Sequence, residues 1–216
     1  VLDQSPIPSG STGGDALRNS IDLARRCEEF GYHRYWVAEH HNTGGLAGSA
    51  PEILIAHIAE ATSRIRVGSG GVMMPHYAPY KVAESFRVLA SLHPGRIDLG
   101  VGRAPGSDQA AMVALAADHQ PISIEKYPSM IAELDGFLHD DLPEGNPFRG
   151  RVRATPNPDE PPHLWLLASS PDSAAYAAHF GLPLAFADFI SQSDGAAIAD
   201  RYRDHYQPSE RHPEPE

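Results

Sequence analysis

The sequence contains a single cysteine, Cys27, which excludes an intrachain disulfide. Chains without disulfides are typical of reducing compartments. Long apolar runs are also missing, so no segment predicts a transmembrane helix. The first ten residues, VLDQSPIPSG, lack the basic start and the apolar stretch of a secretion signal. Together these absences predict a cytoplasmic protein without a membrane partner.

Positive charge is scarce: 17 Lys and Arg stand against 28 Asp and Glu, and the formal net charge is −11. No run of Lys or Arg stands out. Nucleic acid is therefore not expected as a partner, and neither is an anionic membrane, because both attract clustered basic residues. An anionic ligand would need a local pocket lined by basic side chains or backbone amides.

What the sequence does contain is a regular alternation of apolar, strand-length runs and segments with helical spacing. With 216 residues, of which 41% are hydrophobic, the chain suits one domain with a core. Strands are expected at 1–2, 35–38, 65–71, 96–101, 163–168 and 184–187. Helices are expected at 15–30, from 51 onward, and at 80–92, 122–139, 173–180 and 196–206.

This alternation predicts an α/β fold with parallel strands and right-handed crossovers. The strands look apolar throughout, so both faces of the sheet are expected to be covered. A doubly wound sheet and a (β/α) barrel both satisfy these conditions. A complete eight-unit barrel typically needs about 250 residues, so the chain is expected to be about two βα units short. Residues 1–206 are expected to form the domain, with a loop excursion at 140–162 and an unstructured tail at 207–216.

Three local predictions concern the helices. Asp15 is expected to cap the first helix. Ile53 is expected to face the core from the second helix, which Pro51 opens. In the segment 122–139, Pro128 is expected to mark a kink or a boundary.

Polar residues follow the expected strands at the point where each one ends. His40 and His41 follow one strand, and Arg103 follows another. Ser169 and Ser170 follow a third. In both parallel architectures the carboxyl ends of the strands form the ligand site, so these residues are expected to gather there.

The stretch VAEHHN, residues 37–42, places a carboxylate before two imidazoles. A metal site is not expected, because adjacent strand residues point to opposite faces and no HExxH or CxxC pair is present. Two interpretations remain. The stretch is either a solvated turn with one satisfied histidine, or it places an imidazole at a pocket floor, where its pKa suits proton transfer.

Three further segments each allow two interpretations. In LGVGRAPG, residues 99–106, the spacing GxGxxxG does not match a dinucleotide fingerprint, and Arg103 is either a surface ion-pair partner or an anion ligand. WLLASSPDSAAYAAHFG, residues 165–181, suits a phosphate at a helix start or an ordinary N-cap. VGSGG, residues 67–71, allows a flat ring to approach the backbone or forms a tight turn.

Nearly the whole chain resembles the bacterial-luciferase-like flavin monooxygenases. The resemblance runs through GYHRYWVAEHHN, RVGSGGVMMPHYAPYKVAESFRVLASLHPGRIDLGVGRAPG and LWLLASSPDSAAYAAHFGLPLAF. Within the family, the chain is most similar to the single-chain luciferase-family oxidoreductases. The resemblance implies a TIM-type (β/α)8 barrel, here ending after about six βα units, with reduced FMN at the carboxyl face.

The same resemblance implies roles for individual residues. His40 takes the place of a catalytic histidine, and Gly70 and Gly71 correspond to a non-proline cis peptide beneath the flavin ring. The implied phosphate ligands are Arg103, Ser169, Ser170 and Ser173. Met74, His76 and Tyr77 are expected to line the substrate pocket, with a place in the core as an equal alternative for Met74. Two positions depart from the luciferase pattern: Gly102 replaces a reactive cysteine, and Ser169 replaces a glutamate.

The implied reaction is oxidation of a small organic substrate by O2 and reduced FMN through a flavin 4a-peroxide. A separate NAD(P)H-dependent flavin reductase would supply the reduced FMN, and a homodimer is the implied assembly. Three alternatives stay open. They are a non-catalytic FMN-binding protein of this fold, a deazaflavin-dependent oxidoreductase, and an unrelated barrel that binds a sugar or a phosphate ester.

Overall fold

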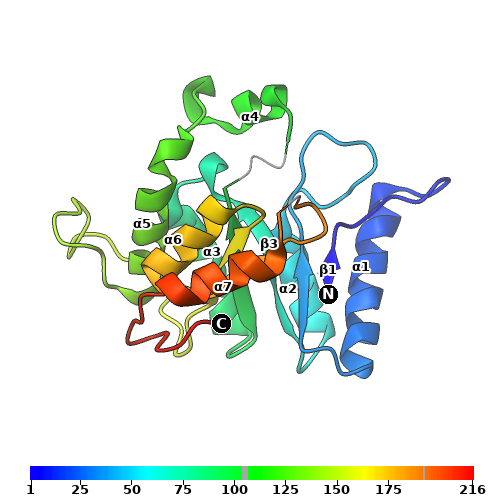
Figure 1. Ribbon diagram of the computed structural model, residues 1–216. Coiled ribbons are helices and arrows are strands. Elements are labelled where there is room, and N and C mark those ends of the chain that lie inside the picture. Colours follow the sequence, from blue (N-terminus) through cyan, green and yellow to red (C-terminus); the bar gives the residue numbers. More distant parts are fainter. Residues whose placement is uncertain (104–106, 192) are drawn as a thin grey trace.

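The computed structural model describes residues 1–103, 107–191 and 193–216. Within these residues, six parallel strands form one sheet in sequence order (Figure 1). The strands are β1 (Leu2–Asp3), β2 (Arg34–Val37), β3 (Arg66–Met73), β4 (Ile97–Gly102), β5 (His163–Ala168) and β6 (Leu184–Phe186). Each crossover passes through at least one helix, which confirms the expected α/β alternation.

The helices of the described residues are α1 (Gly13–Glu29), α2 (Pro51–Ala61), α3 (Pro79–Leu92), α4 (Gln109–Leu115), α5 (Tyr127–His139), α6 (Pro171–Phe180) and α7 (Gly195–His205). Short 3-10 turns lie at η1 (Met74–His76), η2 (Ala117–His119) and η3 (Ile124–Lys126). Helices α2 and α6 contact the sheet directly. Helix α5 packs against α3, and α7 packs against α6. Figure 1 shows α4 standing beyond the carboxyl end of the sheet.

The two faces of the sheet differ in character. Tyr35, Val37 and Leu99 are buried in the main hydrophobic core on the helix-covered face. On the opposite face, Arg34 and Asp98 pair at 3.0 Å beside Trp36. The expectation that the strands are apolar throughout is therefore wrong for this face. Its polar side chains are compatible with burial because they satisfy one another.

The sheet curls, so that its two edges face a common space. Leu2 on β1 and Phe186 on β6 belong to opposite edges, yet both line the same cavity. The strands therefore form a curled half-barrel, and their inward-facing residues share one concave surface. This surface positions the site.

The structure corrects two of the local helix predictions and completes a third. Thr12 caps α1, and Asp15 is the third helical residue of a reciprocal capping box. Ile53 is 62% exposed, so it does not face the core. Pro128 lies in the first turn of α5, where a missing N–H costs no helical hydrogen bond, and it therefore marks a boundary.

The segment 140–162 contains no helix or strand, but a buried cation fixes it to α3. Arg87, 1% exposed, pairs with Asp140 at 2.9 Å. Its guanidinium also donates to Asn157 Oδ1 at 2.6 Å and to the Ala154 carbonyl. The excursion is thus tied down at both ends.

Residues 207–216 were predicted to be an unstructured tail. They contain no helix or strand, but they are held against the domain. Arg211 pairs with Asp135 of α5 at 2.9 Å. The Leu184 amide donates to the Glu216 carbonyl at 3.2 Å. The tail therefore packs beside β6, away from the carboxyl end of the sheet where α4 lies (Figure 1).

Candidate functional site

A cavity of about 870 Å³ occupies the concave side of the sheet and reaches the carboxyl ends of its strands. This volume is within the range of about 300–1,000 Å³ that is usual for small-molecule sites. Polar residues on its wall include His40, Arg103, Ser169 and Ser173. Its apolar wall includes Leu2, Trp36, Met73, Leu167, Phe186, Phe189 and Ile190. The cavity is thus mainly apolar, with a few polar groups that converge.

His40 lies just after β2 on the cavity wall. Its backbone amide donates to the Gly48 carbonyl at 2.8 Å, which fixes the loop. The ring atom Nδ1 is buried and has no hydrogen-bond partner among the described residues. Burial lowers the pKa of His40 below its usual value, the neighbouring Glu39 opposes this shift, and His41 reinforces it. The imidazole is therefore neutral at pH 7, and it lines the cavity with one buried ring nitrogen left without a partner.

Glu39, beside His40, is 0% exposed and was missed by the sequence analysis as a site residue in its own right. Its carboxylate accepts from His41 Nε2 and from the Tyr77 hydroxyl, both at 2.7 Å, and from the Met73 amide at 2.9 Å. Burial and this hydrogen bond raise the pKa of Tyr77. His41 and Tyr77 therefore support Glu39, which in turn fixes the end of β3 beside His40.

The peptide bond between Gly70 and Gly71 is cis, as the family resemblance implied. Gly70 lines the cavity, whereas Gly71 is not among its lining residues. A Cβ on Gly70 would lie 2.7 Å from Leu2 Cδ1, and one on Gly71 would lie 2.3 Å from Leu167 Cδ1. At Gly71 the Gly100 carbonyl oxygen would also lie 2.7 Å away, so only glycine fits there, whereas at Gly70 a Cβ would have to displace the end of the Leu2 side chain.

The other polar wall comes from the ends of β4 and β5. Arg103, Ser169 and Ser173 line the cavity together. Arg103 lies close enough to Tyr127 to oppose the burial that raises the pKa of that phenol. Ser170 is the N-cap of α6, and its hydroxyl accepts from the Ser173 amide at 3.4 Å. Residues 104–106, which end the GRAPG motif, lie outside the described residues.

The predicted substrate-pocket residues Met74, His76 and Tyr77 are not among the described residues that line the cavity. Met74 is 0% exposed and belongs to the hydrophobic core. Its neighbour Met73 is on the cavity wall instead. His76 packs edge-on against His41 with ring centroids 5.8 Å apart, behind the Glu39 carboxylate.

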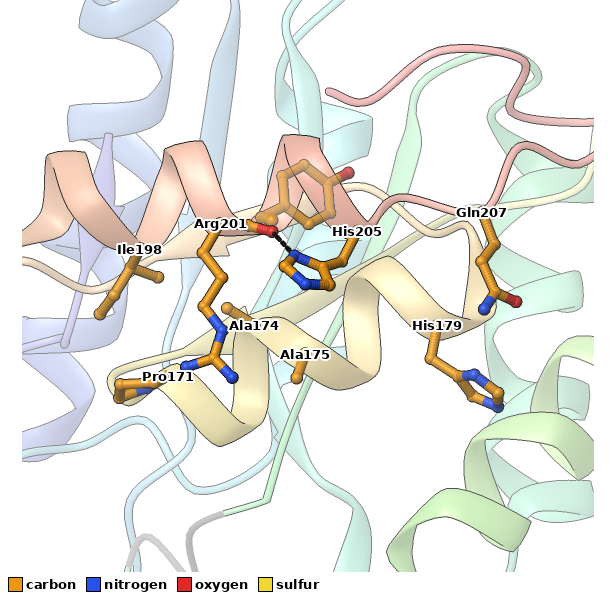
Figure 2. A pocket seen from close by; sticks show the side chains of 9 residues that line it. Pro171, Ala174, Ala175, His179, Ile198, Arg201, His205 and Gln207 are labelled. Atoms are coloured by element: carbon orange, nitrogen blue, oxygen red, sulfur yellow. Dashed lines mark hydrogen bonds between the residues drawn. The ribbon is translucent and has the colours of Figure 1, made fainter.

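A second, smaller pocket of about 210 Å³ lies between α6 and α7. Figure 2 shows Arg201 and His205 reaching from α7 above Ala174 and Ala175 of α6, and His205 Nδ1 lies 2.9 Å from the Arg201 carbonyl. None of the predicted site residues lines this pocket. The larger cavity is therefore the candidate site.

Known proteins resemble this chain in sequence over almost its whole length. The profile of the family described as luciferase-like monooxygenase matches residues 2–215. YwcH of Bacillus subtilis, an uncharacterised protein, is 48% identical over 97% of this chain and 62% of its own. The N-acetyl-S-alkylcysteine monooxygenase of the same species is 46% identical over 88% of this chain and 57% of its own. A luciferase-like monooxygenase of Escherichia coli K12 is 46% identical, over 98% of this chain and 61% of its own.

Solved structures match the fold. Apo-MsnO8 superposes with a TM-score of 0.91 at 43% identity, covering all of this chain and 63% of its own. The oxygenating constituent of 3,6-diketocamphane monooxygenase from Pseudomonas putida, in complex with FMN, has a TM-score of 0.72 at 16% identity. It covers 95% of this chain and 60% of its own, and at this identity it supports the fold alone.

No helix within the described residues combines the length and the apolarity that crossing a bilayer requires. The chain spans about three fifths of the length of the relatives that it matches. From the profile match, the sequence identities and the curled parallel sheet, it follows that this chain belongs to the luciferase-like monooxygenase family.

Proposed function

We propose that the chain forms the flavin site of a monooxygenase that uses reduced FMN and O2 to oxidise a small organic substrate. The observation that carries the proposal is one cavity wall. It unites a histidine that has an unpartnered buried nitrogen with a side-chain-free glycine backbone, an arginine and two serines. The remaining wall is largely apolar, as a site for a planar ring and an organic substrate requires.

These residues suit FMN on chemical grounds. The backbone at Gly70, on the cavity wall, would let a flat ring approach closely, because glycine has no side chain. Arg103, Ser169 and Ser173 provide a cation and two hydroxyls for a phosphate dianion. At the start of α6, Pro171 has no N–H and the Ser173 amide donates to Ser170 Oγ, so the Asp172 amide is the donor that this helix end would add.

Bound reduced FMN would supply the activation of O2 and the transfer of one oxygen atom to the substrate. His40 would exchange a proton with the reacting groups, since it lines the cavity and its lowered pKa keeps the ring neutral at pH 7. Phe186, Phe189 and Ile190 would exclude water from the ring. Glu39 would hold the loop before His40 in register with the end of β3.

The finer features of the whole protein belong to the same proposal. They comprise a closed eight-unit barrel, a homodimer, and a separate NAD(P)H-dependent flavin reductase that supplies the reduced cofactor. Because a relative at 46% identity is an N-acetyl-S-alkylcysteine monooxygenase, a thioether of that class is the first substrate to try.

The test is an anaerobic titration with reduced FMN, followed by rapid mixing with oxygenated buffer. We expect stoichiometric binding and a lag between oxygen consumption and the return of oxidised-flavin absorbance. Binding without a lag would favour the non-catalytic FMN-binding alternative. Preference for a deazaflavin would favour the second alternative, and no flavin binding would overturn the proposal.

Replacing Arg103 tests the contribution of the FMN phosphate to binding separately from that of the flavin ring. Arg103→Ala should weaken FMN binding about tenfold or more, because charge-assisted hydrogen bonds contribute about 1.5–3 kcal/mol. Riboflavin, which has no phosphate, should bind about equally to both proteins. The matched control is Arg201→Ala, an exposed arginine of α7 outside this cavity. Equal losses for FMN and riboflavin would show that Arg103 is not the phosphate ligand.

A further inference from the structure

A cluster of metal-ligating side chains lies at the amino end of the sheet, away from the proposed flavin site. It consists of His163, His212 and Glu216, whose ligand atoms all lie within 4.8 Å of one another. His163 opens β5, while Ala168 closes it beside the cavity wall. At about 3.3 Å per residue, the two ends of β5 are roughly 17 Å apart. A ligand at the cluster would therefore be separate from one at the carboxyl ends.

The contacts within the cluster are close. His163 Nε2 lies 3.8 Å from Glu216 Oε1. The rings of His163 and His212 stack with centroids 5.3 Å apart and an interplanar angle of 8°. Two imidazoles and a carboxylate form the donor set of many three-ligand zinc sites.

The backbone around the cluster holds its members in place. His212 closes a turn in which its amide donates to Ser209 Oγ and its carbonyl accepts from the Ser209 amide, both at 3.0 Å. The Tyr206 hydroxyl donates to the same carbonyl at 3.0 Å. The Glu216 carbonyl accepts from the Leu184 amide. On the other side, the ring of His163 packs against Trp165, with centroids 5.1 Å apart.

The cations around the cluster are engaged elsewhere. Arg66 pairs with Asp98 at 2.7 Å. Arg211, the residue before His212, pairs with Asp135 at 2.9 Å.

We propose that His163, His212 and Glu216 bind one Zn²⁺, which clamps the segment 207–216 to the start of β5. Water would complete a tetrahedron. Ligands of a tetrahedral zinc at about 2.0–2.1 Å lie about 3.3 Å apart, so binding draws the three groups together. The Glu216 side chain is 47% exposed and can move toward the ion. The two imidazoles would also turn, because the lone pairs of rings stacked at 8° do not converge on one ion. The sequence alone predicts no metal site, because these residues come from two distant segments and form no spaced motif.

The test uses the chain without a polyhistidine tag, treated with a chelator and then titrated with Zn²⁺ in a calorimeter at pH 7. We expect one site with a dissociation constant of about 1 µM or tighter, and a rise in the melting temperature that EDTA reverses. His212→Gln and Glu216→Gln should each weaken this site at least tenfold. Glu216→Gln alters an exposed carboxylate, so it keeps the fold even if a histidine variant does not.

The matched control is His179→Gln, an exposed histidine of α6 outside the cluster, which should leave Zn²⁺ binding unchanged. Co²⁺ should give the visible absorption of a tetrahedral complex in the wild type and lose it in Glu216→Gln. No saturable Zn²⁺ site would overturn the proposal. So would Zn²⁺ binding that is equal in the wild type and in both cluster variants.

Discussion

Two carboxylates in this molecule are buried to the same extent but have different kinds of hydrogen-bond partner. Asp98, near the amino end of β4, and Glu39, just beyond the carboxyl end of β2, are both 0% exposed. Asp98 accepts from the guanidinium groups of Arg34 and Arg66 and from the indole of Trp36. Glu39 accepts from an imidazole, a phenol and a backbone amide, none of which carries a permanent charge.

The difference separates structural burial from burial that serves a site. Two arginines pair with the charge of Asp98, so the charged groups at the amino end of the concave face are neutralised by one another. We call this end of the sheet the closed end and the end with Glu39 the open end. The charge of Glu39 has no arginine or lysine partner among the described residues, and it acts on His40 and Tyr77 instead. One end of the sheet satisfies its polar groups internally, and the other leaves a buried nitrogen of His40 without a hydrogen-bond partner among the described residues.

The largest expected effect comes from breaking the closed end. Asp98→Asn leaves Arg34 and Arg66 facing each other without a counter-charge, and we expect a loss of about 3 kcal/mol in the free energy of unfolding. Urea denaturation measures this loss. Asp159→Asn, an exposed carboxylate, should change the same quantity by less than about 0.5 kcal/mol. Equal, small effects of the two variants would mean that the Asp98 network contributes little.

A smaller loss of stability, with a spectroscopic signature, is expected at the open end. Glu39→Gln keeps the shape but removes the charge and weakens the bonds to His41 and Tyr77, and it should cost about 1–2 kcal/mol. The pKa of Tyr77 should fall, because the Glu39 hydrogen bond and charge help to raise it. Phenolate absorbance at about pH 11 detects this, with Tyr77→Phe variants as blanks and the exposed Glu144→Gln as the control. An unchanged Tyr77 titration would contradict the assigned coupling.

The comparison also shows how far the sequence can be used. The order of strands and helices was predictable, because apolar runs and helical spacing are local signals. The strand ends predicted that His40, His41, Arg103, Ser169 and Ser170 gather, and of these His40, Arg103 and Ser169 line one cavity. The contrast between Asp98 and Glu39 was not, since their partners lie 32–64 and 2–38 residues away along the chain.

Two misses have specific physical reasons. At the end of β3, a shift of one residue exchanges the two faces, so the sequence left Met74 open between pocket and core and did not point to Met73. The structure places Met74 in the core and Met73 on the cavity wall. Helix α4 is seven residues long, and its sequence QAAMVAL is apolar after the first residue, so it shows no alternation of apolar and polar faces that would predict a helix. Its local signal is the N-cap Asp108, which accepts from the Ala111 amide at 2.9 Å.

The smallest expected effect is a pH dependence of the folding stability that comes from His40 at the open end. Burial lowers the pKa of His40 below 6.5, so the folded protein binds fewer protons there than the unfolded chain. The contribution of this group to stability is therefore complete above about pH 6.5 and is lost as the pH falls toward the lower folded pKa. An NMR titration of the imidazole C–H signals, assigned with His40→Asn, measures this pKa. In Glu39→Gln it should fall further, because the carboxylate that raises it is gone. A His40 pKa above 6.5 would contradict the lowering by burial, and a pKa that rises in Glu39→Gln would contradict the opposing effect of Glu39.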